Sequence, residues 1–297
     1  MAGLEVKGVI PAMVTPFTKD GEIDVEGLRG LARWLIDCGV DGLFPLGTIG
    51  EGPKLGREER TKVLRAVLEE AKAGIPVIPG TGAMTTRDAI TYTRDAKDLG
   101  AQAAVIHPPS YYHPSPRALL SHYKAVAEKT DFPIILYNLP SFVGYSIPIE
   151  VVVEAAKDPN VIGIKDSSAD MLYYQALLNQ TPNGFNVIQG YGSLFLPSLI
   201  LGAKATLCGE GNVAPKVLVE MYKSYLRGDY GEARRLHFKL VTLVSVMGYG
   251  TFPVAVKEAM NVLGLPGGYA LPPAEPLSEQ EKEGLKEALK RAGLMEE

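Results

Sequence analysis

Short, strongly apolar runs alternate along the chain with longer runs in which apolar residues recur every three or four positions. Eight short runs can be counted: GVIPAMVTPF, GLFPLG, PVIPGTG, AAVIHPP, PIILYN, VIGIKD, NVIQG and KATLCG. Several are apolar almost throughout, which is typical of strands covered on both faces. The longer runs have the spacing of amphipathic helices. Strict alternation of eight such units predicts an α/β fold. It favours a closed parallel (β/α)8 TIM barrel rather than an open doubly wound sheet.

Capping residues support the predicted helices. Residues at or near plausible helix N-termini precede four of these runs: Asp24, Thr85, Ser115 and the pair Ala169–Asp170. Glycines stand where helices are expected to end: Gly39, Gly74 and Gly100.

The chain continues beyond the eighth strand–helix unit. Three further runs there have helical spacing: DYGEARRLHFKLVTLVSVM, PVAVKEAMNVLG and SEQEKEGLKEALKRAG. The last two are joined by a Pro/Gly-rich connector, LPGGYALPPAEPLS. We therefore predict a barrel over residues 1–226 and a C-terminal helical extension over residues 227–297.

Composition agrees with one globular α/β barrel. The chain has 297 residues, 46% of them hydrophobic and 22% charged. An α/β barrel takes roughly 250 residues as one domain. The net charge of −4 and the lack of a basic run argue against a nucleic-acid surface. No apolar run reaches the roughly 18 residues of a membrane span, and the first residues lack the long apolar region of a signal peptide.

Cysteine and histidine usage is sparse. Cys38 and Cys208 lie far apart and form no disulfide framework, so we expect both to be buried as small apolar residues. There are four histidines and neither a CxxC nor an HExxH motif, so no metal site is predicted. These features favour a cytoplasmic protein.

Lys165 is the most unusual residue of the predicted strands. It stands at the end of the apolar run NVIGI, where burying a lone ammonium group is costly. Either a carboxylate such as Asp166 pairs with it, or the lysine is kept for its chemistry. Because active sites of such barrels lie at the C-terminal ends of strands, Lys165 is placed where chemistry is expected.

Other residues at strand ends fit a lysine that reacts with carbonyl compounds. A neutral amine can attack a ketone and form an imine, which eases cleavage or formation of the adjacent carbon–carbon bond. A hydroxyl such as that of Tyr137 or Thr48 could move the proton. The GTIG turn, residues 47–50, could hold a carboxylate through backbone N–H groups. Taken singly, the tyrosines could equally be packing residues and the turn a structural one.

A series of motifs resembles the dihydrodipicolinate synthase / N-acetylneuraminate lyase family. In order, the motifs are GVIPAMVTPF, GTIGE, YYHPS, YNLPSFVG, GIKDSS and GNVAP, and they extend over essentially the whole chain. The resemblance implies a (β/α)8 barrel with a helical C-terminal extension. It also implies a homotetramer built of two tight dimers, and no cofactor beyond a covalent imine with pyruvate.

The resemblance also implies roles for single residues. By motif position, Lys165 resembles the Schiff-base lysine, Tyr137 the proton-relaying tyrosine and Thr48 the hydroxyl residue of that relay. Tyr112 resembles a tyrosine that reaches in from the neighbouring subunit. Two positions match the lining of the keto-acid pocket, Gly190 and Leu207.

Two departures from the family pattern bear on the substrate. Ile49 replaces a second hydroxyl residue beside Thr48 and offers the carboxylate only its backbone N–H. Phe142 stands where the synthase carries an arginine for the aldehyde's carboxylate, and a phenyl ring cannot replace that bidentate contact. The GIKDSS motif resembles the keto-acid aldolases, in which Ser167 would contact the second part of the substrate.

The predicted function is a metal-independent class I aldolase, a lyase. It would cleave a 2-keto acid such as 2-keto-3-deoxygluconate or 4-hydroxy-2-oxoglutarate to pyruvate and an aldehyde, reversibly. The alternative is the dihydrodipicolinate synthase reaction, which condenses pyruvate with aspartate semialdehyde. An alternative of another class is a non-catalytic regulator that binds pyruvate.

Overall fold

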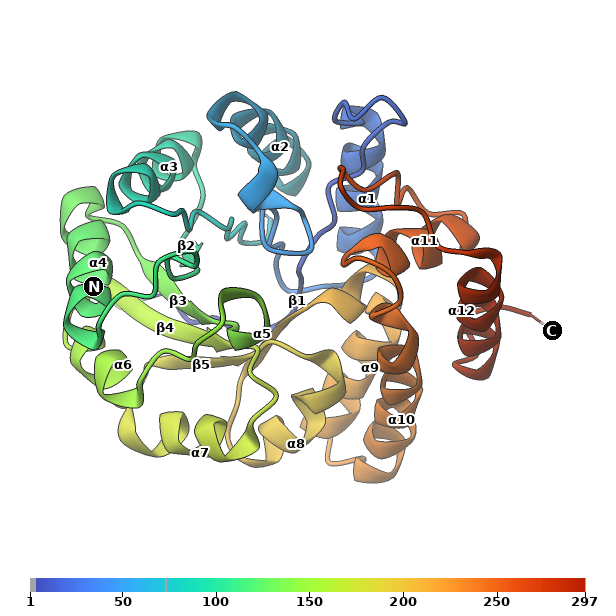
Figure 1. Cartoon of the computed structure of the whole chain (residues 1–297). Coiled ribbons are helices and arrows are strands. Elements are labelled where there is room, and N and C mark those ends of the chain that lie inside the picture. Colours follow the sequence, from blue (N-terminus) through green and yellow to red (C-terminus); the bar gives the residue numbers. More distant parts are fainter. Residues whose placement is uncertain (1–3, 73, 297) are drawn as a thin grey trace.

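The computed structural model of the chain describes residues 4–72 and 74–296. Residues 1–3, 73 and 297, which the predicted ranges include, lie outside the described part. Figure 1 shows the strands at the centre of a ring of helices. The strands are β1 (Gly8–Pro11), β2 (Ala104–Ile106), β3 (Ile134–Asn138), β4 (Val161–Asp166), β5 (Asn186–Gln189) and β6 (Ala205–Cys208).

The helices surround the strands and then continue beyond them. Those around the barrel are α1 (Val25–Asp37), α2 (Arg57–Ala71), α3 (Thr86–Leu99), α4 (Pro116–Thr130), α5 (Pro140–Val143), α6 (Ile149–Ala155), α7 (Met171–Gln180), α8 (Phe195–Ile200) and α9 (Pro215–Leu226). Those of the C-terminal region are α10 (Tyr230–Met247), α11 (Val254–Val262) and α12 (Glu279–Arg291).

The sheet closes into a barrel. In the described part of the chain, six strands pair in parallel in the order β1-β6-β5-β4-β3-β2. Single parallel bridges complete the ring between β1 and β2: Ala12 with Phe44, Leu43 with Val77, and Gly80 with Val105. The predicted α/β barrel with C-terminal helices is therefore confirmed.

The second and third predicted strands are bridges rather than regular strands. Proline has no backbone N–H, so it interrupts the hydrogen bonds between strands. Pro45 follows the first of these segments, and Pro76 and Pro79 flank the second. The remaining N–H groups still pair, as Met13 N donates to Phe44 O over 2.9 Å and Val105 N to Pro79 O over 2.9 Å. The barrel therefore closes here with fewer hydrogen bonds between neighbouring segments.

The helix caps largely match their predictions. The side chains of Asp24, Thr85, Ser115 and Asp170 each accept a hydrogen bond from a backbone N–H of the following helix. Gly39 and Gly100 take the left-handed conformation after α1 and α3, with φ of 82° and 98°. The prediction for Gly74 is wrong, because Lys72 takes the left-handed conformation at the end of α2, with φ of 46°.

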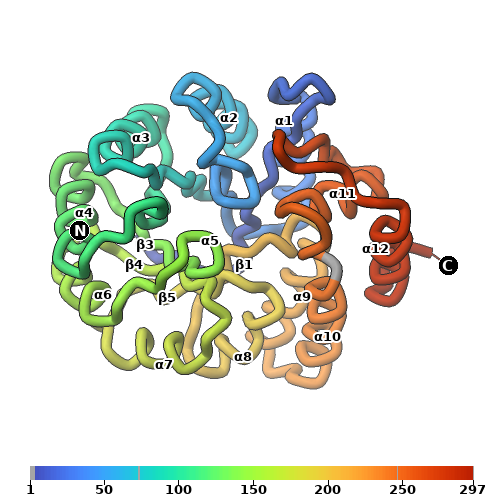
Figure 2. The backbone as a smooth tube through the Cα atoms, viewed as in Figure 1, coloured from blue at the N-terminus to red at the C-terminus, as the bar shows by residue number. Residues whose placement is uncertain are grey.

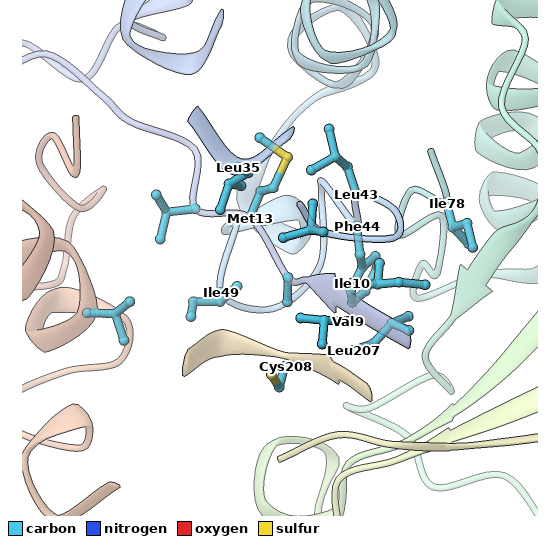
Figure 3. Close-up of a cluster of buried hydrophobic side chains, with 14 of the residues drawn as sticks. Val9, Ile10, Met13, Leu35, Leu43, Phe44, Ile49, Ile78, Leu207 and Cys208 are labelled. Carbon is cyan, nitrogen blue, oxygen red and sulfur yellow. The ribbon is translucent and has the colours of Figure 1, made fainter. Parts of the chain in front are cut away.

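A continuous apolar core explains why the strand sequences are apolar on both faces. Every residue of β4 is buried, because one face lines the barrel interior and the other contacts helices. Figure 3 shows part of the larger core cluster, with Leu207 of β6 and Val9 of β1 among its buried side chains. Cys38 and Cys208 are buried as predicted.

The C-terminal helices pack on the barrel and return to its first segment. Helix α10 lies along α9 and α12 (Figure 1). In Figure 2 the red C-terminal segment lies beside the blue segment that precedes α1, where Tyr269 N donates to Phe17 O over 2.9 Å. Among the helices of residues 4–72 and 74–296, none combines the length and apolar composition that a membrane span requires.

Candidate active site

A cavity of about 260 Å³ opens at the C-terminal ends of the strands. Six residues predicted from the sequence line it together: Thr48, Ile49, Tyr137, Lys165, Ser167 and Gly190. Because the carboxyl ends of parallel strands meet at one end of a barrel, segments far apart in sequence converge here.

Lys165 lies inside this cavity. It pairs in register with Tyr137 on the neighbouring strand, so both side chains point to the same side of the sheet, the barrel interior. Only 3% of Lys165 is exposed. Its Nζ lies 3.7 Å from the centroid of the Tyr137 ring and 5.3 Å from that of Phe44. The amine therefore faces aromatic rings in a mostly apolar cavity.

Asp166 does not neutralise Lys165. Its carboxylate belongs to the opposite face of β4, where it accepts hydrogen bonds from Asn138 Nδ2 over 2.7 Å and from Ser168 Oγ over 2.9 Å. No ion pair found among the described residues includes Lys165. The alternative in which this lysine serves only as a salt-bridge partner of Asp166 is therefore wrong.

The phenol of Tyr137 has a lowered pKa. Burial raises its pKa, but the positive charge of Lys165 and hydrogen-bonding contacts with Lys165, Thr48 and Ser167 lower it, and the net pKa lies below the ordinary value. The ring also packs edge-on against Phe44, with centroids 6.3 Å apart. A fixed phenol with a lowered pKa exchanges its proton more readily near neutral pH.

The turn that carries Thr48 and Ile49 joins the first bridged segment to α2. Ile49 is buried, and its Cδ1 lies so near Gly209 that a β-carbon there would approach it to 2.7 Å. This packing directs the Ile49 side chain toward β6, as Figure 3 shows. Thr48 remains at the cavity beside Tyr137.

Gly190 follows β5 at a point where no side chain fits. Its N–H donates to Asp166 O over 2.7 Å, and an added β-carbon would lie 1.9 Å from Ser167 Oγ. A glycine is therefore required for the two strand ends to approach each other and leave Ser167 in the cavity wall.

Two predicted residues lie outside this cavity in the single chain. Leu207 is fully buried in the barrel core and does not line the cavity. Tyr112 is 81% exposed and packs edge-on against Tyr111, with ring centroids 5.1 Å apart. The predicted role of Tyr112 places it in the site of a neighbouring subunit, so its exposure here agrees with that role without testing it.

The outer wall of the cavity is apolar and comes partly from the C-terminal region. Phe142 packs edge-on against Phe252, with centroids 5.2 Å apart, and α10 adds Val244 and Met247. Sequence reasoning missed Phe252, Val244 and Met247 because they belong to no strand end. No sequence signal connects them to the barrel mouth.

Two polar residues were also missed. Tyr191 directly follows Gly190 and lines the cavity, so extending the strand-end rule by one residue would have found it. Glu210 also lines the cavity, is 3% exposed and accepts a hydrogen bond from Ser193 N over 3.1 Å. It follows β6 in the GEGN segment.

Comparisons with known proteins agree with this geometry. Residues 5–292 match the model of the Dihydrodipicolinate synthetase family. The chain is 37% identical over 291 residues to the 4-hydroxy-tetrahydrodipicolinate synthase of Methanosarcina mazei, covering 98% of this chain and 99% of that one. It is 38% identical over 289 residues to the synthase of Archaeoglobus fulgidus, covering 97% and 99%.

Solved structures give the same result. The chloride-inhibited dihydrodipicolinate synthase from Acinetobacter baumannii, complexed with pyruvate, has a TM-score of 0.94, 36% identity, and coverage of 98% of this chain and 100% of that one. A prophage protein of the dihydrodipicolinic acid synthase family from E. coli K12, in complex with pyruvate, has a TM-score of 0.94, 33% identity, and coverage of 97% and 99%.

Proposed function

The chain belongs to the dihydrodipicolinate synthetase family of pyruvate-dependent enzymes, and on this premise we propose that it is a lyase acting through an imine on Lys165. The observation that carries the proposal is the placement of a buried amine against Tyr137 in a cavity at the strand ends. In the described residues this amine has no carboxylate partner, so it is available for a carbonyl carbon.

Each residue then has a defined task. The Lys165 amine attacks the ketone of pyruvate and water leaves, forming the imine. The Thr48–Ile49 turn binds the carboxylate, Gly190 leaves room beside it, and Ser167 contacts the second part of the substrate. Tyr137, with Thr48, moves the proton as the carbon–carbon bond forms or breaks. Tyr112 of a neighbouring subunit completes the relay in a homotetramer, and the bound pyruvate needs no further cofactor.

Two reactions differ in the aldehyde partner. The full-length relatives are named 4-hydroxy-tetrahydrodipicolinate synthase, which supports condensation of pyruvate with aspartate semialdehyde more directly than aldol cleavage. The phenyl rings of Phe142 and Phe252 offer no charged partner to the carboxylate of aspartate semialdehyde, and this supports a 2-keto acid aldolase, such as one for 2-keto-3-deoxygluconate. No arginine lines the described cavity to bind the semialdehyde carboxylate.

Reduction with borohydride tests the imine. Incubation with pyruvate and borohydride should add the mass of one reduced pyruvate to each chain, and peptide mapping should place it on Lys165. Lys165→Arg is the matched control, because it keeps the charge and loses the nucleophilic amine. An intact mass unchanged in the wild-type chain would refute the imine.

A panel of aldehydes separates the reactions. Pyruvate is offered with glyceraldehyde, glyoxylate, aspartate semialdehyde or N-acetylmannosamine, and pyruvate consumption is followed. Fastest turnover with aspartate semialdehyde supports the synthase, whereas fastest turnover with glyceraldehyde or glyoxylate supports the keto-acid aldolase. Imine formation without turnover of any aldehyde supports the pyruvate-binding regulator. Cytoplasmic residence and the homotetramer stay predictions, the latter open to measurement by light scattering.

A further inference from the structure

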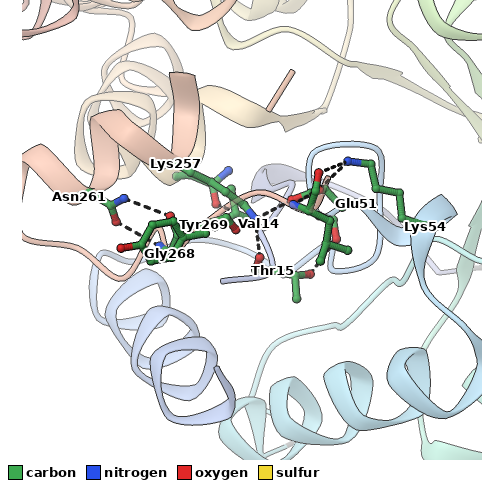
Figure 4. Close-up of polar contacts among 11 residues, drawn as sticks. Val14, Thr15, Glu51, Lys54, Lys257, Asn261, Gly268 and Tyr269 are labelled. Atoms are coloured by element: carbon green, nitrogen blue, oxygen red, sulfur yellow. Dashed lines mark hydrogen bonds and ion pairs between the residues drawn. The ribbon is translucent and has the colours of Figure 1, made fainter. Parts of the chain in front are cut away.

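A second buried lysine lies far from the imine site in sequence and takes no part in the proposed chemistry. Lys257 of α11 is 1% exposed. Its Nζ donates to Glu51 Oε1 over 2.6 Å, to Thr15 O over 2.8 Å and to Tyr269 O over 2.6 Å, as Figure 4 shows. All three of its protons are used, which is the condition under which a buried ammonium group is tolerated.

The partner of Lys257 ends the turn that carries Thr48. Glu51 is 2% exposed, and its second oxygen, Oε2, accepts from Lys54 Nζ over 2.9 Å and from Leu271 N over 3.0 Å. Both carboxylate oxygens are therefore bound, and two of the donors belong to the C-terminal region. The chain beyond the barrel thus holds one end of the GTIGE segment.

A second connection reaches the same turn. Thr15, whose carbonyl binds Lys257, donates its hydroxyl to Gly50 O over 2.8 Å. Lys257 therefore contacts the turn through the Glu51 carboxylate and, one residue earlier, through Thr15 and Gly50. The remaining anchor, Tyr269 O, lies on the segment that pairs with Phe17.

The backbone of the turn requires such support. Leu46 and Glu51, which flank it, have φ of 61° and 54° although neither is glycine. Side chains with a β-carbon seldom adopt this conformation, and it persists only where the surroundings hold it. The residues held between these two positions are Gly47–Gly50, the proposed carboxylate-binding turn.

We propose that Lys257 is a positioning residue, which fixes the Thr48–Ile49 turn for the carboxylate of the keto acid through Glu51 and Thr15. This rests on the proposed function of that turn. It assigns the C-terminal helices a part in the site that differs from the wall of Phe252: they set the geometry of a barrel loop. A buried ion pair is a poor source of stability but can specify one arrangement.

Steady-state kinetics of Lys257→Met tests the proposal. A turn that shifts by a fraction of an ångström should bind the carboxylate less well, so we expect KM for pyruvate to rise about 10-fold or more, with a smaller change in kcat. A purely structural lysine would reduce the number of active chains, counted by borohydride trapping, and leave KM unchanged. Lys204→Met, which removes an exposed ion pair with Glu5, is the matched control and should behave as wild type.

Two further measurements keep the test decisive. Thr15→Val removes only the hydroxyl contact with Gly50, so it carries the kinetic test if Lys257→Met does not fold, and KM should rise about 3-fold or more. Amide hydrogen exchange of residues 44–55 should accelerate about 10-fold in either variant, whatever the substrate. Unchanged exchange and unchanged KM would overturn the positioning role, whereas absence of trapping in wild type would refute only the imine.

Discussion

At the scale of single residues, two buried lysines show how surroundings decide the use of an amine. Lys257 faces a carboxylate and two carbonyl groups, which hold its charge in place. Lys165 faces the rings of Tyr137 and Phe44. All three ammonium protons of Lys257 are used in hydrogen bonds, whereas the nitrogen of Lys165 lies beside the open space of the cavity. The same residue type is thus structural in one place and, by our proposal, nucleophilic in the other.

Tyr137→Phe should separate proton transfer from imine formation. The phenol is placed beside Lys165 with a lowered pKa, so its loss removes the proton relay and keeps the ring that packs on Phe44. We expect kcat to fall about 10²-fold or more. Pyruvate should still be trapped on Lys165, at a lower rate. Phe44→Leu serves as a control for lost ring packing, and a kcat for Tyr137→Phe within about 3-fold of wild type would exclude the relay role.

Phe142→Arg should change the choice of aldehyde. The side chain is 52% exposed and lies at the cavity wall, so a guanidinium there has room to meet a carboxylate. We expect kcat/KM for aspartate semialdehyde to rise about 10-fold, the value of one charge-assisted contact. Phe142→Gln, polar but uncharged, is the matched control. Equal effects of the two variants would show that removing the ring, and not adding the charge, is what matters.

At the scale of elements, the sequence predicts most of the barrel because periodicity and caps are local. It places Lys165, Tyr137 and Thr48 together because parallel strands end at one side. The bridged segments around Pro45 and Pro79 are predicted as regular strands because their composition is apolar. Apolar composition does not show that proline lacks the N–H group needed for the hydrogen bonds between strands. The contribution of Phe252 was not predictable, because it depends on where the C-terminal region returns to the barrel.

The packing of α3 against α4 should make stability depend on pH. His122 of α4 is 4% exposed, and its Nδ1 lies 2.9 Å from Thr86 Oγ1 of α3. Burial, assisted by His107, lowers its pKa to about 4 from an ordinary value of 6.5. Between these values the unfolded chain binds more protons than the folded one. Stability is therefore lost as the pH falls through this window.

Replacement of His122 by Gln removes this titration and keeps a polar partner for Thr86. Between about pH 7 and about pH 5 the wild-type chain should lose about 2 kcal/mol more than His122→Gln, measured as the free energy of unfolding in urea. Burial also lowers the pKa of His107, so His107 causes a loss of stability at low pH in both chains. The difference between the two chains therefore reports His122 alone. Parallel pH profiles would contradict the assignment.

At the scale of the whole molecule, the barrel and the C-terminal helices share one core. Leu236, Leu240 and Leu243 of α10 are 6%, 0% and 1% exposed and belong to the same apolar cluster as Val9 and Leu207. The predicted boundary at residue 226 coincides with the end of α9. The boundary thus separates the strand–helix units of the barrel from the helices that follow them. The shared apolar cluster argues that these two parts do not fold independently.

A chain of residues 1–226 should therefore fail to fold cooperatively. Removing residues 227–297 takes α10 away from the apolar side of α9 and leaves the Glu51 carboxylate with Lys54 as its ionic partner and without Lys257, and breaking a buried ion pair by removing one partner is strongly destabilising. We expect no cooperative thermal transition by circular dichroism and no trapping of pyruvate. A chain of residues 1–295, which keeps α12 and the core contacts of Leu294 and Met295, is the matched control and should unfold as wild type does. A cooperative transition in the 1–226 chain together with pyruvate trapping would show instead that the barrel is complete without the extension, and Lys257 would then have no necessary part in holding the Thr48–Ile49 turn.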